Sequence, residues 1–379
     1  MNSLPFQPVP CRSTCFVLLA AILLSPIAGC GLLGLDDSGG DEDPEPSPPP
    51  SIEFFQNHPS SSALHVTRAD TVLAAYRADR EQPLASTVKY TVAIEYARQA
   101  AADTIRPDSL IPLDHINRFM SLTGPTAKQL HQDWINQARD EDRVQNGQVS
   151  LRTVARGMIK YSSNPATEYL MDLLTPTAIN QGLSEIGLQR HDRLHYLVSD
   201  LYVGVQEGLE GEERAQFMRD LTAEERASRA AQIHRKLAQD DGYSYRDSLT
   251  LPGPDVQRAW SDHLPASTAR EYGHLMQQIN DRALMTEEAH GYLHEVLEVK
   301  IDNPRYSHAG LKGGSTTWVF TQAAFFTEKQ DGTQTEYVVL LDGSPKAQNR
   351  LSDLNDDFGK GLMNDPSYRR TLAQTLGGS

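Results

Sequence analysis

The sequence predicts a mixed α/β protein of the α+β type, with an antiparallel sheet built from both chain ends, flanking helices and an inserted all-helical subdomain. Residues 63–76 and residues 318–341 each contain two apolar segments of strand length separated by a polar turn. Helix-favouring segments dominate the chain between about residues 107 and 297. Strands at both ends of a chain can pair in one sheet, so we expect a cleft where that sheet joins the helical subdomain.

The elements follow from local patterns. The first predicted hairpin pairs residues 63–66 with residues 71–76, because a polar turn divides two apolar runs. A helix is predicted over residues 86–102, where apolar side chains recur with helical spacing. Further helices are expected at 151–160, 166–174, 223–239, 268–282 and 347–363, and the strands of the second hairpin at 318–327 and 336–341.

Composition excludes several classes of function. The 379 residues carry a formal net charge of −15, which repels the phosphate backbone of a nucleic acid. The three cysteines, Cys11, Cys15 and Cys30, all lie within the first thirty residues. The folded part therefore has no disulfide, thiol nucleophile or thiolate metal site. No cofactor is expected. The sequence carries no sign of an oligomeric state, and a monomer is expected.

The first 29 residues predict a lipoprotein signal peptide. Arg12 precedes an apolar stretch over residues 13–29 that is short for a membrane span. Its end, Ile27-Ala28-Gly29-Cys30, resembles a bacterial lipobox, which implies cleavage before Cys30 and lipidation of that cysteine. We therefore expect an exported bacterial lipoprotein, anchored to a membrane of the cell envelope on the periplasmic or outer side. The alternative is an ordinary signal peptide with a chance cysteine.

Residues 30–51 predict an acidic, proline-rich linker, because they are dominated beyond residue 35 by Asp, Glu, Ser, Gly and Pro. The folded domain is expected over residues 52–379, with its helical subdomain at about 107–297. Residues 200–250 are rich in charged residues and predict an extra helical insertion near the cleft.

Three motifs carry the candidate chemistry. Ser86-Thr87-Val88-Lys89 is an S-x-x-K at a helix start, which places a hydroxyl and an amine about one turn apart on one face. Such an amine can act as a base near neutral pH if burial or a second cation lowers its pKa. Ser162-Ser163-Asn164 lies between two helical runs, where Asn164 could also cap a helix. Lys312-Gly313-Gly314-Ser315 lies just before or within a strand.

With these motifs in this order, the sequence resembles the penicillin-recognising serine hydrolases, and most closely the class A β-lactamases. The resemblance covers most of residues 60–363. It implies a β-lactamase/transpeptidase-like fold and a covalent acyl-enzyme mechanism on β-lactam-like or D-alanyl peptide amides. The first expectation is β-lactamase-like activity, and the next is peptidoglycan D-alanyl-D-alanine peptidase or esterase activity.

The resemblance also implies roles for individual residues. Ser86 is the nucleophile, activated by Lys89, and Ser162 passes a proton to the leaving nitrogen. Lys312 supplies positive charge that keeps the pKa of Lys89 low and attracts a substrate carboxylate. Asn164, Gly313, Gly314 and Ser315 contact the substrate. The backbone N–H groups of Ser86 and Ser315 form the oxyanion hole.

The sequence departs from the family pattern at three places. Ser163 stands where aspartate is usual, and Gly313 where a threonine or serine hydroxyl would bind the substrate carboxylate; Ser315, Thr316 or Thr317 could replace that hydroxyl. Residues 187–200 lack the glutamate that activates the deacylating water. Asp192, Asp200 and Glu207 are candidates for that role. Without a positioned base, the acyl-enzyme should be long-lived and antibiotic hydrolysis slow.

Two other classes of function stay open. The histidine pairs 191/195 and 290/294 have the four-residue spacing of metal ligands, but each lacks the glutamate of H-E-x-x-H, and solvated helix faces are the expected explanation. No metal site is therefore predicted. The other alternative is a non-catalytic envelope lipoprotein that binds peptidoglycan or a partner.

Overall fold

The computed structural model describes residues 47–120, 124–298 and 304–377. The predicted signal peptide, Cys30 and most of the predicted linker lie outside these residues. In the described ranges, no helix combines the length and apolar character needed to cross a membrane.

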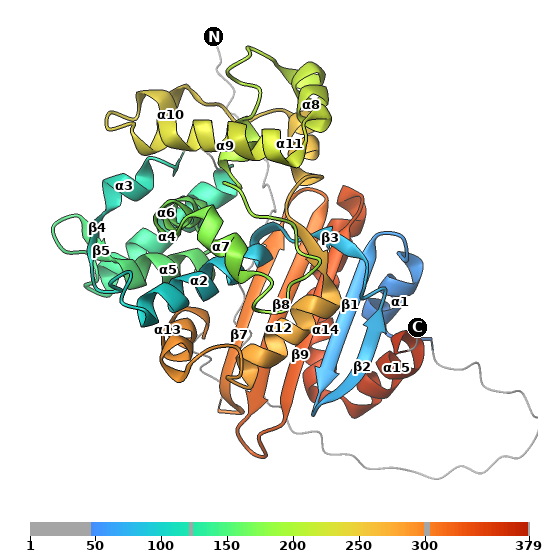
Figure 1. Cartoon of the computed structure of the whole chain (residues 1–379). Helices are drawn as coiled ribbons and strands as arrows, with labels where there is room; N and C mark the ends of the chain where they lie inside the picture. The colour runs from blue at the N-terminus through green and yellow to red at the C-terminus, as the bar shows by residue number, and fades with distance from the viewer. Residues whose placement is uncertain (1–46, 121–123, 299–303, 378–379) are drawn as a thin grey trace, which may run out of the picture. The chain divides into compact units, whose positions relative to one another are not determined.

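A five-stranded antiparallel sheet organises the domain, in the order β2-β1-β9-β8-β7 (Figure 1). Among the described residues, the first strand, β1, pairs with the last, β9, with Leu64 opposite Val339. The two ends of the chain therefore meet in one sheet, as the sequence predicts. The strands are β1 (Ser62–Arg68), β2 (Thr71–Tyr76), β7 (Tyr306–Ser315), β8 (Val319–Glu328) and β9 (Gln334–Asp342).

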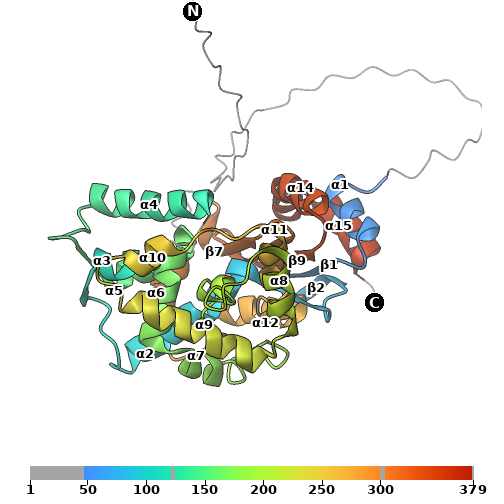
Figure 2. The same ribbon diagram turned by 90° about the horizontal axis from the view of Figure 1, so that it is seen from above.

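Both faces of this sheet are covered, which explains the continuous apolar run in β9. Val338 and Leu340 point into the core shared with the helical section, whereas Val339 and Leu341 point into a second core. Helix α12 (Ala269–Asn280) packs on the first face. The second face is covered by α1 (Pro50–Asn57), α14 (Pro345–Asn364) and α15 (Pro366–Leu376), which Figure 2 shows on one side of the sheet.

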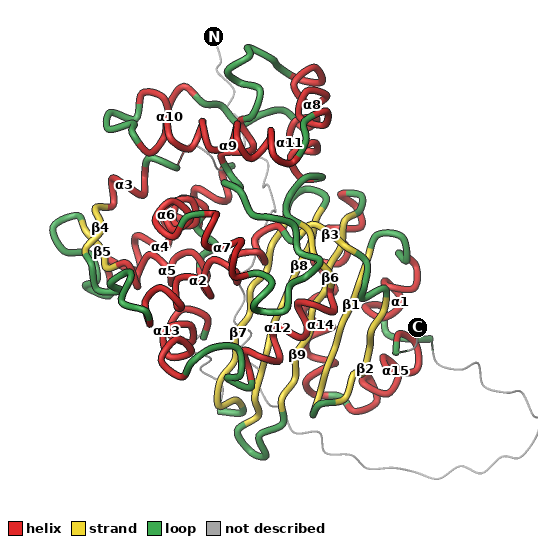
Figure 3. The backbone as a smooth tube through the Cα atoms, in the orientation of Figure 1, coloured by secondary structure: helices red, strands yellow, loops and turns green. Residues whose placement is uncertain are grey.

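The helical section is built around α2 (Lys89–Ala101), which is buried on almost all sides and packs against helices α5, α6, α7 and α13. Two short antiparallel pairs, with three residues in each strand, lie outside the main sheet (Figure 3). Strand β3 (Glu81–Pro83) pairs with β6 (Ala266–Thr268), and β4 (Leu110–Pro112) pairs with β5 (Gln148–Ser150). The other helices are η1 (Ala85–Val88), α3 (Leu113–Asn117), α4 (Pro125–Asp140), α5 (Leu151–Lys160), α6 (Asn164–Leu174), α7 (Pro176–Gly182), η3 (Ser199–Tyr202), α8 (Gly211–Asp220), α9 (Ala223–Ala238), α10 (Ser244–Ser248), α11 (Pro254–Ser261) and α13 (Glu287–Leu297).

The structure refines two boundaries. The helix predicted over residues 86–102 begins with the 3₁₀ turn η1, and regular α-helix starts only at Lys89. Helix α1 begins at Pro50, a residue well suited to a first helical turn. Ser51, assigned above to the linker, is buried in this helix, where its Oγ lies 2.8 Å from the hydroxyl of Tyr368.

Candidate active site

Ser86 lies in a tight turn that β8 holds in place. Its predecessor Ala85 has φ +44°, a left-handed conformation that is strained for a residue with a side chain. The Thr321 hydroxyl donates to Leu84 O at 2.8 Å and lies 2.7 Å from the Thr87 hydroxyl, so strand and turn are tied together. Ser86 itself is partly exposed, and its Oγ makes no hydrogen bond to any described residue. The nucleophile candidate is thus presented on a constrained turn.

Strand β7 approaches this turn through a glycine. A Cβ at Gly314 would lie 2.4 Å from the backbone nitrogen of Ser86 and 2.9 Å from that of Thr87. No side chain fits there, so glycine is required for β7 to pack against the turn. Ser315 follows directly and is exposed. The roles of the Ser86 and Ser315 N–H groups as oxyanion donors, and of Gly313 in substrate binding, stay predictions.

Two buried lysines converge on Ser162. Lys89 Nζ donates to Ser162 O and to Asn164 Oδ1, each at 2.8 Å, and lies 3.1 Å from Ser162 Oγ. Lys312 Nζ donates to the same Ser162 Oγ at 3.0 Å and also to Gly313 O. The hydroxyl of Ser162 therefore bridges the two amines. The structure thus brings together four of the predicted site residues: Lys89, Ser162, Asn164 and Lys312.

The electrostatics of the two lysines differ from those of surface lysines. Burial is the larger cause that lowers the pKa of Lys89 well below its usual value, and the nearby charge of Lys312 lowers it further, against an opposing effect of Glu168. Burial also lowers the pKa of Lys312 to about 7. No carboxylate forms an ion pair with either amine within the described part of the chain. The arrangement therefore favours the uncharged form of Lys89 far more than a surface position would.

The Ser162-Ser163-Asn164 loop is held by residues that the sequence does not single out. Ser162 has φ +53°. Ser163 caps α6 by accepting from Ala166 N at 3.2 Å, and its Oγ lies 2.7 Å from His131 Nδ1. His131 Nε2 lies 3.1 Å from Asn117 Oδ1, which can only accept, so this nitrogen carries the proton and Nδ1 accepts from Ser163. Burial lowers the pKa of His131 to about 4, which keeps the ring neutral.

Glu168, one helical turn after Asn164, is a second unpredicted residue. Its carboxylate is fully buried and accepts from Val198 N at 2.7 Å and from the Ser199 hydroxyl at 3.0 Å. His234 Nδ1 in α9 lies 2.9 Å from the same carboxylate. Glu168 therefore ties helix α6 both to the loop before η3 and to the inserted helices.

His234 also faces a second carboxylate, that of Asp172. The Nε2 atom is 3.1 Å from Asp172 Oδ1, close enough for charge pairing but off the line of a hydrogen bond. Burial lowers the pKa of His234, but the contacts with Asp172 and Glu168 outweigh burial and raise it. The ring stacks between Tyr196 and Phe119.

The carboxylates considered for deacylation all have other partners. Asp200 is buried and forms a bidentate pair with Arg226, at 2.8 and 2.7 Å. Asp192 Oδ2 accepts from Ala266 N at 2.9 Å, and Glu207 pairs with Arg229. None of these carboxylates, nor that of Glu168, makes a hydrogen bond or ion pair with the predicted site residues.

The three candidates to replace the hydroxyl that is missing at Gly313 differ in their contacts and exposure. The Thr316 hydroxyl accepts from Trp318 N and Val319 N and lies 2.8 Å from Ser261 Oγ at the end of α11. It therefore shapes the β7–β8 turn and binds that turn to α11. Ser315 and Thr317 are exposed, and their hydroxyls stay candidates.

The histidine pairs differ from the expectation of solvated helix faces. His290 and His294 lie on α13 but are only 2% and 7% exposed, so they are core residues. His191 and His195 lie in a loop, not on a helix, and His191 is also buried. The four-residue spacing of His191 and His195 therefore does not correspond to a helix. Among the residues described, no three His, Cys, Asp or Glu side chains form a group that could hold a metal ion.

Comparison of the sequence with known proteins gives one family match. A family model described as the β-lactamase enzyme family matches residues 53–317. None of the curated proteins matches the sequence.

Solved structures with a similar chain course include a class A β-lactamase from Bacteroides cellulosilyticus, at 15% identity over 87% of this chain and 98% of that one, with a TM-score of 0.47. A β-lactamase from Sphaerobacter thermophilus gives 16% identity over 83% and 96%, with a TM-score of 0.48. PBP-A gives 14% over 87% and 99%, with a TM-score of 0.47. On the match of the family model to most of its folded part, this chain belongs to the β-lactamase enzyme family.

Proposed function

We propose that this protein is a serine acyl-transfer enzyme that opens β-lactam-like or D-alanyl peptide amides through a covalent intermediate on Ser86. The observation that carries the proposal is the contact of two buried amines, Lys89 and Lys312, with the hydroxyl of Ser162 at 3.1 and 3.0 Å. Burying two amines without a carboxylate is costly, and such groups occur where their altered pKa serves a reaction.

Acylation then proceeds as follows. The Ser86 oxygen attacks the amide carbon, a C–O bond forms, and the Ser86 proton passes to uncharged Lys89. The negative charge that develops on the carbonyl oxygen is stabilised by the N–H groups of Ser86 and Ser315. When the C–N bond breaks, the leaving nitrogen takes a proton that Ser162 delivers and Lys89 replaces. The product is an ester on Ser86 and a neutral amine.

The donor and acceptor capacity of Lys89 supports this proton path. An uncharged amine has two N–H donors, which suffice for Ser162 O and Asn164 Oδ1, both at 2.8 Å. Its lone pair is then left for a proton, and Ser162 Oγ is 3.1 Å away. The direct Ser86–Lys89 hydrogen bond is not formed in the substrate-free arrangement, and such bonds often tighten only when substrate binds.

Hydrolysis of the ester needs a base that activates water. The buried or surface carboxylates of Glu168, Asp192, Asp200 and Glu207 are engaged by other partners. We infer that deacylation is slow. Slow loss of a β-lactam adduct argues against an efficient antibiotic-degrading β-lactamase. A D-alanyl peptidase or esterase that binds penicillin is the second candidate within the same chemistry.

The test is incubation with a fluorescent penicillin followed by intact-protein mass spectrometry. We expect one covalent adduct, lost in Ser86→Ala and kept in the matched control Ser307→Ala, an exposed serine on β7. Labelling that survives Ser86→Ala contradicts the assignment. Absence of labelling in the wild-type protein would instead favour the non-catalytic envelope role.

A second measurement separates the two subtypes. Hydrolysis of a chromogenic cephalosporin is expected to be slow compared with acylation, so the adduct should persist after excess antibiotic is removed. Rapid turnover with no detectable adduct would mean that one of the carboxylates above, or a residue outside the described ranges, activates water.

We also propose that the domain is tethered to the cell envelope through a lipid on Cys30, as the lipobox-like Ile27-Ala28-Gly29-Cys30 suggests. Metabolic labelling with a fatty-acid analogue should mark the wild-type protein and not Cys30→Ser. Equal labelling of both forms would argue against a lipid at this cysteine.

A further inference from the structure

The carboxylate of Glu168 is a buried charge that the acyl-transfer steps above do not use. The side chain is fully buried and lies four residues after Asn164 in α6. Residues four apart share a face of a helix, so Glu168 lies on the same side of α6 as Asn164, whose Oδ1 accepts from Lys89 Nζ at 2.8 Å. Helix α6 packs against α2, which begins with Lys89. The fold therefore places a buried carboxylate one helical turn from the residue that holds the amine.

The Glu168 carboxylate is fixed in one orientation. Oε1 accepts from Val198 N at 2.7 Å, and Oε2 accepts from the Ser199 hydroxyl at 3.0 Å. His234 Nδ1 lies 2.9 Å from the same Oε2. Among the described residues, no Lys or Arg pairs with this carboxylate. Its charge is therefore balanced at close range only by a histidine.

His234 connects this carboxylate to α9 of the insertion. Its Nε2 atom lies 3.1 Å from Asp172 Oδ1, and its ring stacks on Tyr196. Burial lowers the pKa of His234, but the contacts with Asp172 and Glu168 outweigh burial and raise it. The other charged groups around α9 and η3 contact one another: Asp200, Arg226 and His195.

Two charges act on the Lys89 amine in opposite directions. Burial is the largest cause that lowers the pKa of Lys89, and Lys312 on β7 lowers it further, whereas Glu168 on α6 raises it. To take the Ser86 proton, Lys89 must be uncharged, yet it must be basic enough to hold that proton. A general base is most effective when its pKa lies near the working pH. An amine weakened by burial and by a neighbouring cation is therefore helped by an opposing negative charge.

We propose that Glu168 is a positioning residue of the acyl-transfer step: its charge, held in place by His234 from α9, acts on Lys89 so that the amine can both take and keep the Ser86 proton. This inference rests on the proposed function, because that function makes Lys89 the base. It gives the inserted helices a part in the chemistry, since α9 supplies one of the groups that fix the carboxylate.

Glu168→Gln tests the inference through the pH profile of penicillin labelling. The amide keeps the size of the side chain but removes its charge, so the pKa of Lys89 should fall. The acid limb of the profile should therefore move to lower pH by about one unit. The maximum rate should fall about threefold, because the amine is then a weaker base. A change in packing alone would slow labelling without moving the acid limb.

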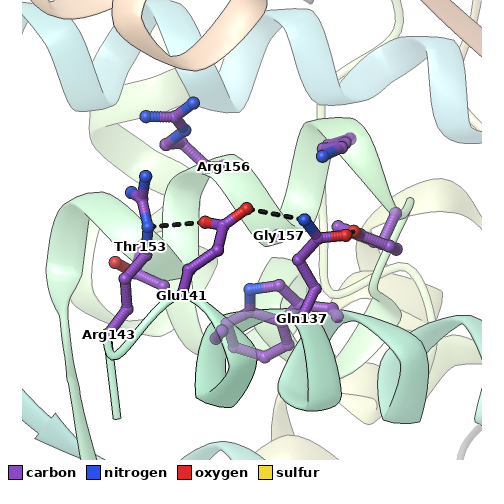
Figure 4. Close-up of a pocket in the computed structure, with 10 residues that line it drawn as sticks. Gln137, Glu141, Arg143, Thr153, Arg156 and Gly157 are labelled. Atoms are coloured by element: carbon purple, nitrogen blue, oxygen red, sulfur yellow. Dashed lines mark hydrogen bonds and ion pairs between the residues drawn. The ribbon is translucent and has the colours of Figure 1, made fainter.

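Three control variants separate charge from packing. Glu168→Asp keeps the charge, and Ser199→Ala removes one hydrogen bond to Glu168 but no charge. Glu141→Gln removes an unrelated carboxylate in a hollow between α4 and α5 that no predicted site residue lines; Figure 4 shows it between Gln137, at 2.6 Å, and Arg143, at 2.7 Å. All three should keep the acid limb of the parent protein. An acid limb that moves equally in Ser199→Ala and Glu168→Gln overturns the inference.

A direct titration of Lys89 makes the result independent of acylation. In protein labelled with carbon-13 at lysine Cε, the signal of Lys89 is identified by its loss in Lys89→Met. Its pKa should be lower in Glu168→Gln than in the parent protein, and an equal or higher pKa overturns the inference. If circular dichroism shows that Glu168→Gln does not fold, Glu168→Asn compared with Glu168→Asp makes the same comparison in a shorter side chain.

The two proposals fail in different ways. Absence of labelling in the parent protein overturns the proposed function, and with it the assignment of Lys89 as the base. A parent protein that is labelled on Ser86, with a Lys89 pKa that Glu168→Gln leaves unmoved, overturns this inference alone.

Discussion

The site around Ser86 and the contacts between α6, η3 and α9 treat buried charge in opposite ways. At the site, Lys89 and Lys312 are 1% and 4% exposed and contact no carboxylate. Between α6, η3 and α9, Asp200 is paired with Arg226, and Glu168 with His234, although all four side chains are just as buried.

The difference indicates which buried charges hold the fold in one arrangement and which are available for a reaction. A buried pair with complete hydrogen bonding keeps its elements in one arrangement, and losing one partner strands the other. A buried amine without a carboxylate partner costs stability but is ready to bind an anion or move a proton. The contrast predicts that removing a buried charged group mainly slows the reaction at the Ser86 site, whereas it mainly lowers stability between α6, η3 and α9.

The largest expected effect is on the rate at which Ser86 reacts with penicillin. Lys89→Met should slow penicillin labelling of Ser86 by about 10²–10⁴-fold, the usual contribution of a general base. The free energy of unfolding should fall by no more than about 1 kcal/mol, because the lost hydrogen bonds are offset by removal of an unpaired buried amine. Urea denaturation and labelling rates measure the two effects. A large loss of stability would mean that Lys89 is structural.

Between α6, η3 and α9 the effect is on stability. Asp200→Ala leaves the guanidinium of Arg226 buried and unpaired, and should lower the free energy of unfolding by about 3–5 kcal/mol. The matched control is Asp79→Ala, which breaks the exposed bidentate pair with Arg270 and should cost less than about 1 kcal/mol. Equal losses in the two variants would remove the distinction between the regions.

The third effect is a pH dependence of labelling. Lys312, whose pKa burial lowers to about 7, is charged below that pH and neutral above it. Labelling by an anionic penicillin should therefore decline as pH rises through about 7, by about tenfold per pH unit. At lower pH, protonation of Lys89 should also slow it.

Lys312→Arg separates the two limbs of this profile. Its guanidinium stays charged throughout, so the alkaline decline should disappear while the acidic decline remains. An unchanged alkaline limb would assign that decline to another group.

The smallest expected effect concerns the contact that holds the Ser162 loop. His131→Ala and Ser163→Ala should each slow labelling about tenfold, as is usual for residues that position a functional group. Because the two side chains act through one hydrogen bond, the double variant should be little slower than either single one. Gln132→Ala, on the exposed side of α4, is the control. Fully additive effects would show that His131 does not act through Ser163.

The sequence predicts the sheet and the main helices well, because apolar runs and helical spacing are local signals. The strands β8 and β9 and helix α5 lie where these signals place them. The three-residue strands β3 to β6 are too short to show any periodicity. No local pattern predicts helix α1, because its proline-rich start resembles the linker before it.

The motifs that carry the candidate chemistry can be found from the sequence, whereas the residues that hold these motifs in position cannot. His131 lies 32 positions before Ser163, and His234 lies 66 positions after Glu168. Only the packing of α4 and α9 against α6 brings these side chains together, and no local pattern marks them. For the same reason the prediction of solvated histidine pairs is wrong, because spacing along the chain does not show which side of a helix other elements cover.

The pairing of β1 with β9 has a consequence for biogenesis. Strand β9, at the centre of the sheet, is made long after its partner β1, so a ribosome must pass Glu328 before the turn bearing Ser86 can contact β8 and Asp342 before the sheet can close. Contacts between such distant segments give a high contact order and slow folding. Truncation after about residue 300 should therefore yield a chain that cannot assemble this sheet, rather than a smaller working enzyme.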